Sequence, residues 1–282
     1  MRVSVGDVSL YFDVEGSGLV VDGDVMAERP TLLLLHGGPG FDHTNFKPDY
    51  GCLADVAQVV YLDHRGNGRS DHGDPSRWSL DVWADDVRKF CDAVGIERPI
   101  VLGWSFGGMV AMAYAARHPD HPAKLILQST MGRLNVERIA EGFRAVGGDH
   151  AGQVAKRFWS ESGAEAMADY AATCLPLYSP VPTDPAGITR AQLNFDLLAD
   201  PARYMRDMDL LPGLASVSCP TLVVAGEVDP ICTLADAEDI VAALPADKVR
   251  FERFPKAGHF VQDIDSERFF GLVRQFITAP AD

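Results

Sequence analysis

The stretch Ile100-Val101-Leu102-Gly103-Trp104-Ser105-Phe106-Gly107-Gly108 decides the fold of this chain. Its apolar start predicts a strand, and the run that follows, Met109 to Ala116, predicts a helix. A serine on the tight turn between them is pushed clear of the sheet, and the flanking glycines tolerate strained backbone and close helix–strand contact. The pattern Gly-x-Ser-x-Gly alone is weak, and the strand and helix around it carry the interpretation. Ser105 is therefore the candidate nucleophile.

A serine hydroxyl is a poor nucleophile at neutral pH, so Ser105 requires a histidine base and a carboxylate that orients it. His259 is the histidine near the C-terminus, in a glycine-containing loop after the strand candidate 248–254. Asp229 follows the strand candidate 220–225 and is the candidate acid, with Glu227 as the alternative. The chain order of nucleophile, acid and base is that of the α/β-hydrolase fold.

Backbone N–H groups near Ser105 are candidates for an oxyanion hole. The apolar run 31–35 predicts a buried parallel strand, and it opens into His36-Gly37-Gly38-Pro39-Gly40. We expect the N–H of Gly38 and that of Phe106, at the start of the helix, to stabilise a tetrahedral intermediate. Neither glycine cluster has the spacing of a phosphate loop or a dinucleotide fold, which argues against nucleotide binding.

At this point the residues resemble the α/β-hydrolases, and more narrowly their proline iminopeptidase-like branch. The loop 36–40 resembles that branch's oxyanion loop, and Asp63-His64-Arg65-Gly66-Asn67-Gly68-Arg69-Ser70 is similar to the family's Asp-x-Arg-Gly-x-Gly-x-Ser segment. The resemblance implies that Ser105, Asp229 and His259 form the triad and that the Gly38–Pro39 bond is cis. It also implies that Asp63 and Arg65 pair beneath the site.

Alternating strands and helices predict an α/β fold with a mostly parallel central sheet flanked by helices. Residues 2–14 predict a hairpin, and the further strand candidates are 31–35, 58–62, 99–103, 124–128, 220–225 and 248–254. After the sixth strand the strand pattern stops, and helical patches at 135–146, 151–173 and 188–206 take over, broken by prolines. We expect an α/β-hydrolase core from residues 1–130 and 211–282, with a helical cap, or lid, from 131–210.

The cap and the nucleophile turn supply candidate substrate-binding residues, namely Trp104, Trp159, Glu161 and Glu165. By resemblance, proline iminopeptidases use acidic cap residues to hold the substrate's free amino terminus, and Trp159 with Glu161 partly matches their pattern. On one helix Glu161, Glu165 and Asp169 would form an acidic column that could capture an amine. In so acidic a chain, we favour the interpretation that these carboxylates form a solvated helix face.

The composition narrows the class of substrate. The chain has 282 residues, a net charge of −15 and a sequence pI near 4.8, which argues against nucleic acid and anionic membranes as partners. A small molecule or short peptide, neutral or cationic, fits better. The five cysteines have no Cys-x-x-Cys spacing, so we expect core thiols and neither a disulfide framework nor a metal site. Without a signal-like segment or a long apolar stretch, a cytoplasmic protein is the expectation, with its oligomeric state open.

Together these features predict a serine hydrolase that acts through an acyl-enzyme on a small amide or ester and needs no metal or organic cofactor. The resemblance points to release of an N-terminal proline. The turn Gly-Trp-Ser-Phe-Gly, in place of the branch's Gly-Gly-Ser-Trp-Gly, and the apolar cap favour a carboxylesterase or lactonase as the alternative. A non-catalytic ligand receptor is a more distant alternative.

Overall fold

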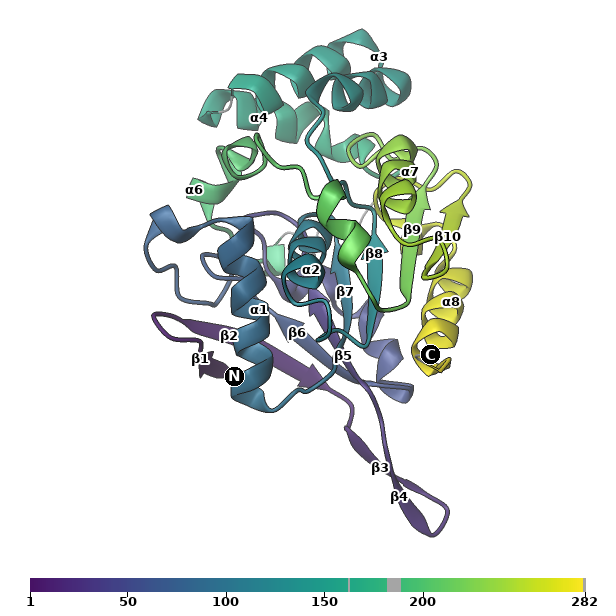
Figure 1. Cartoon of the computed structure of the whole chain (residues 1–282). Coiled ribbons are helices and arrows are strands. Elements are labelled where there is room, and N and C mark those ends of the chain that lie inside the picture. Colours follow the sequence, from purple (N-terminus) through teal and green to yellow (C-terminus); the bar gives the residue numbers. More distant parts are fainter. Residues whose placement is uncertain (162, 182–188, 281–282) are drawn as a thin grey trace.

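Eight strands form one central sheet in this computed structural model, which describes residues 1–161, 163–181 and 189–280 (Figure 1). Their spatial order is β1 (Arg2–Ser4), β2 (Ser9–Glu15), β6 (Gln58–Leu62), β5 (Thr31–Leu35), β7 (Ile100–Trp104), β8 (Lys124–Gln128), β9 (Thr221–Gly226) and β10 (Val249–Phe254). The pairs β1–β2 and β2–β6 are antiparallel, and all the other pairs are parallel. The predicted mostly parallel sheet and N-terminal hairpin are confirmed.

The central strands are apolar because both faces of the sheet are covered. Every residue of β7, β8 and β9 is buried. Within β5, Leu33 and Leu35 pack toward α1 (Leu80–Val94) and α2 (Phe106–Arg117), whereas Leu32 and Leu34 pack toward α8 (Ser266–Thr278). α7 (Leu234–Ala243) joins the α1 and α2 face. Continuous apolar runs therefore predicted these strands to within one residue at either end.

Between β8, the sixth strand of this sheet in chain order, and β9, the chain forms helices that lie above the sheet in Figure 1. These include α3 (Val136–Glu161), which is kinked at Gly148, α4 (Ala164–Thr173) and the short α6 (Phe195–Leu198). The prediction of one helix over 151–173 was wrong, because Gly163, with φ 105°, separates α3 from α4. The prediction of one helix over 188–206 was also wrong for the described residues, because the short α6 is followed by a separate 3-10 helix at Pro201–Tyr204. Residue 188 of that prediction lies outside the described residues.

A second, two-stranded sheet was not predicted. β3 (Leu19–Asp22) pairs antiparallel with β4 (Val25–Glu28), and this hairpin projects from the end of the molecule opposite α3 and α4 (Figure 1). Both of its faces reach solvent, and Val21 is 74% exposed. The alternation of polar and apolar residues that identifies a half-buried strand is therefore missing here.

Candidate active site

Ser105 occupies the turn between β7 and α2 in a strained backbone conformation. Its φ of 55° and ψ of −120° lie in a region that residues other than glycine rarely adopt. The glycines beside it permit the tight packing around this turn. A Cβ atom at Gly107 would lie 1.9 Å from the carbonyl oxygen of Leu35, and one at Gly103 would lie 2.3 Å from the carbonyl oxygen of Gly107. The predicted strand, turn and helix are confirmed.

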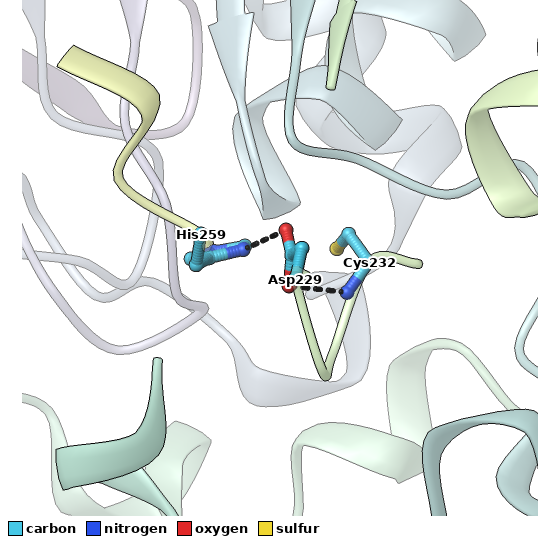
Figure 2. Close-up of side chains that lie close together, drawn as sticks. All are labelled: Asp229, Cys232 and His259. Atoms are coloured by element: carbon cyan, nitrogen blue, oxygen red, sulfur yellow. Dashed lines mark hydrogen bonds and ion pairs between the residues drawn. The ribbon is translucent and has the colours of Figure 1, made fainter. Parts of the chain in front are cut away.

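His259 and Asp229 form a buried pair next to this turn. Nδ1 of His259 lies 2.8 Å from Oδ2 of Asp229, and the two residues are 2% and 4% exposed (Figure 2). The other carboxylate oxygen, Oδ1, accepts hydrogen bonds from the backbone N–H groups of Ile231 and Cys232. Glu227, the alternative acid, is exposed. Asp229 is thus the carboxylate that orients the imidazole ring.

Ser105 and His259 line the same cavity, which has a volume of about 300 Å³. The backbone N–H of His259 donates to the carbonyl oxygen of Tyr178 at 2.7 Å, and the Trp104 ring lies 5.5 Å from the imidazole ring. Trp104 and Trp159, both named from the sequence, also line this cavity. The walls come partly from the core and partly from the segment between β8 and β9, which contributes Trp159, Leu175, Tyr178 and Met205.

The glycine loop after β5 lies against the serine turn. A Cβ atom at Gly37 would lie 3.3 Å from Cβ of Ser105, and Gly38, with φ 138°, lines the cavity. The Gly38–Pro39 bond is cis, as the resemblance led us to expect. Phe106 is the first residue of α2, so its N–H has no acceptor within the helix. Its side chain points into the core against Trp83.

The chain is similar to known proteins in both sequence and structure. The family model described as alpha/beta hydrolase fold matches residues 30–149. A putative carbamate hydrolase RutD from Caulobacter sp. (strain K31) is 26% identical, covering 95% of this chain and 98% of that protein, and a proline iminopeptidase from Lactiplantibacillus plantarum is 26% identical, covering 91% and 95%. The crystal structure of proline iminopeptidase from Mycobacterium smegmatis aligns with a TM-score of 0.76 at 24% identity, covering 98% of this chain and 97% of that one.

The chain has the α/β-hydrolase fold. Its sequence is similar to that of proline iminopeptidases, and the names of its relatives support hydrolase activity. Among the described residues, no helix is long and apolar enough to cross a membrane.

The sequence prediction that Asp63 and Arg65 pair with each other was wrong. Oδ1 of Asp63 accepts from Nδ1 of His43 at 2.7 Å, whereas Arg65 makes a two-bonded contact with Asp86 and another with Asp7. Burial alone would raise the pKa of Asp63, but the hydrogen bond from His43 and nearby charges outweigh it, and the pKa falls below its usual value. Both residues are fully buried, in two separate networks.

Glu161 and Glu165 lie away from the cavity. They belong to α3 and α4, so the expectation of one acidic column on one helix was wrong. Nitrogen atoms of Arg157 lie 3.6 Å from the carboxylate of Glu161 and 3.3 Å from that of Glu165, and Asp169 binds the same guanidinium at 2.9 Å. All four side chains are more than a third exposed. Neither glutamate is among the described residues that line the Ser105 cavity.

Cys232 is a site residue that the sequence analysis missed. It lines the Ser105 cavity, and four of the five cysteines are buried, whereas Cys52 is exposed and so departs from the expected core thiols. Burial raises the pKa of the Cys232 thiol well above its usual value, although a hydrogen bond with the Ser105 side chain opposes this. The sequence could have indicated Cys232 through its position three residues after Asp229, because the backbone N–H of Cys232 donates to Oδ1 of Asp229.

A second cavity, of about 880 Å³, adjoins the first. The two share Gly38, Phe41, Trp159, Leu175 and Tyr178. Side chains between β8 and β9, including Phe158, Met167 and Leu193, supply most of its walls and make it predominantly apolar. The space beside Ser105 is therefore extended by a chamber that suits an apolar group.

Proposed function

We propose that this protein is a serine hydrolase that works through an acyl-enzyme, with Ser105 as nucleophile, His259 as base and Asp229 as the acid. The observation that carries this proposal is that a serine in a strained turn shares one cavity with a histidine whose other ring nitrogen is hydrogen-bonded to a buried aspartate. Nucleophile, base and orienting group are the set that acyl transfer requires.

The reaction follows from these positions. His259 accepts the Ser105 proton through Nε2 while Oγ attacks the substrate carbonyl, and Asp229 stabilises the imidazolium through Nδ1. The N–H groups of Gly38 and Phe106 bind the oxyanion, each contributing roughly 3 kcal/mol of barrier reduction. His259 then protonates the leaving group and activates a water molecule that releases the acid from Ser105.

The proposed substrate class is a short peptide or arylamide with an N-terminal proline. Supporting this are the His-Gly-Gly-Pro-Gly loop at residues 36–40 and the similarity to proline iminopeptidases over nine-tenths of the chain. We propose that residues 131–210 act as a cap on a core of residues 1–130 and 211–282, because the cavity lies between residues of both parts. The position of Glu161 and Glu165 outside that cavity removes the support for amine capture by these two residues.

An ester or lactone with a sizeable apolar group is the second candidate. The chamber of about 880 Å³ next to the Ser105 cavity favours it, because an apolar acyl group gains from burial there about 0.8 kcal/mol per methylene. An imino acid such as proline leaves most of that volume unused.

One experiment separates the candidates. Initial rates of wild type and Ser105→Ala are measured on a proline anilide, a short acyl ester and a medium-chain acyl ester. Anilide turnover that disappears in Ser105→Ala supports the peptidase, whereas turnover of esters alone, faster for the longer chain, supports the esterase. Activity in Ser105→Ala within a few-fold of wild type contradicts the mechanism, since removal of such a nucleophile abolishes most of the catalysis.

A further inference from the structure

Three side chains with different metal-binding atoms meet beside the proposed base. Asp229, Cys232 and His259 offer a carboxylate oxygen, a sulfur and an imidazole nitrogen that all lie within 4.8 Å of one another, and all three residues are buried. Figure 2 shows the three side chains converging from two loops, one after β9 and one after β10. The proposed hydrolytic mechanism uses Asp229 and His259 but leaves Cys232 without a role.

This donor set is one that proteins use for zinc. Zn²⁺ prefers thiolate, imidazole and carboxylate ligands in tetrahedral geometry, with bonds that place neighbouring ligand atoms about 3.5 Å apart. Because all three donor atoms lie within 4.8 Å of one another, no separation exceeds that spacing by more than about 1.3 Å. Cys232 and His259 line the Ser105 cavity, which supplies an entry path and room for a water molecule as fourth ligand.

The second layer of contacts is already in place. Oδ1 of Asp229 is held by the N–H groups of Ile231 and Cys232, and the backbone of His259 is fixed by the Tyr178 carbonyl. Such contacts orient metal ligands and strengthen binding. The net charge of −15 also favours the approach of cations.

We propose that Asp229, Cys232 and His259 bind one Zn²⁺ or a similar thiophilic divalent cation, and that this binding reversibly inhibits hydrolysis. Metal binding is independent of the proposed function, whereas the inhibition rests on it. On coordination the thiol gives up its proton to solvent, so that two negative charges and one neutral ring face the dication.

Coordination stops the base whichever ring nitrogen is used. A metal ion on Nε2 of His259 occupies the lone pair that accepts the Ser105 proton. A metal ion on Nδ1 displaces the Asp229 hydrogen bond and leaves the neutral ring protonated on Nε2, where it can no longer accept a proton.

A second group, Asp42, His43 and Asp63, also brings possible ligand atoms within 4.8 Å of one another. Here a cation is already present, because the Arg69 guanidinium forms an ion pair with Asp42, and Asp63 accepts hydrogen bonds from His43 and the Arg69 N–H. It also lacks sulfur. A spectroscopic probe that responds to thiolate ligation therefore distinguishes the two groups.

The probe is Co²⁺, added to tag-free Cys52→Ser protein so that the exposed thiol is absent. We expect one equivalent to bind, with a thiolate-to-cobalt charge-transfer band and visible bands of tetrahedral cobalt. Both features should persist in Ser105→Ala and in a Cys219→Ser control, and should be lost in Cys232→Ser and Cys232→Ala. Persistence of the charge-transfer band in Cys232→Ala, or its absence in the Cys52→Ser protein, overturns the proposal.

Inhibition is then measured with ZnCl₂ on the substrate that the wild type hydrolyses, each variant being compared with its own metal-free rate. We expect the half-inhibitory concentration to rise at least about tenfold in Cys232→Ala and to stay unchanged in Cys219→Ser. Equal inhibition of all variants refutes the inhibitory role. If neither Cys232 variant folds, X-ray absorption of the cobalt-loaded Cys52→Ser protein decides, because a first shell without sulfur refutes the site. A catalytically silent protein that still gives the cobalt spectrum would reject the hydrolase proposal and leave the metal site standing.

Discussion

Nδ1 of His259 lies 2.8 Å from Oδ2 of Asp229, and the second oxygen of that carboxylate is held by two backbone N–H groups. Hydrogen bonds therefore fix the positions of both carboxylate oxygens. Turning the imidazole ring away from its present orientation would break its hydrogen bond to Oδ2 of Asp229. The pair consequently sets which ring nitrogen faces the cavity that contains Ser105.

Replacing Asp229 with Asn should lower kcat by about 10⁴-fold with little change in folding, because the amide can donate to Nδ1 and stabilise the tautomer that cannot act as base. The matched control is Glu227→Gln, which removes the exposed carboxylate two residues earlier. Steady-state kinetics of both variants on the same substrate test this. A larger loss in Glu227→Gln than in Asp229→Asn would make Glu227 the acid.

Much of the core was predictable because its short residue patterns are compatible with one local structure each. The run Thr31–Leu35 is apolar throughout since its alternate residues face two different clusters of helices, and the strand has the bounds that the sequence predicts. The nucleophile turn was predictable for a related reason. Glycine at 103 and 107 is needed where a Cβ atom would collide with backbone.

Partners brought together by tertiary packing were not predictable from the sequence. Arg65 binds Asp86, which lies on α1, 21 positions later in the chain, and nothing in the segment 63–70 encodes that choice. Cys232 enters the site because two carboxyl-end loops converge, a relationship between residues 27 positions apart that the scattered cysteine spacing did not reveal. The bounds of the helices above the sheet depend on single residues such as Gly163. Its φ of 105° separates two helices, although the sequence pattern on either side of it predicts one continuous helix.

Introducing Ala at Gly107 should destabilise the protein by about 3 kcal/mol, because its Cβ would lie 1.9 Å from the carbonyl oxygen of Leu35 and backbone must move to relieve the clash. The same substitution at Gly271, inside α8 with open space around it, should raise stability by up to about 1 kcal/mol. Chemical denaturation of the two variants tests the contrast. Equal effects would show that the packing of α2 on β5 tolerates a methyl group.

Removing the carboxylate of Asp86 should cost about 3 kcal/mol, since it leaves the fully buried Arg65 guanidinium with the partly exposed Asp7 as its remaining ion-pair partner. On the same helix, Asp92→Ala breaks an exposed pair with Arg88 and should change stability by less than about 0.5 kcal/mol. Urea denaturation of Asp86→Ala and Asp92→Ala measures both values. A similar loss in the two variants would mean that burial does not set the cost of breaking these pairs.

Asp263, at the edge of the Ser105 cavity, should make stability depend on pH. Partial burial and then the charge of Asp49 raise the pKa of Asp263 from 3.8 to about 6. The folded state therefore holds this proton more tightly than the unfolded state, and its contribution to stability is lost as pH rises from about 4 to about 6.

Asp263→Asn should be more stable than wild type above pH 6, by no more than about 1 kcal/mol because the side chain reaches solvent, and the advantage should disappear near pH 4. Denaturation midpoints measured between pH 4 and pH 6 test the sign of this pH dependence. Asp49→Asn should give a smaller gain in stability over the same pH range. A stability advantage of Asp263→Asn that is constant with pH would contradict the raised pKa.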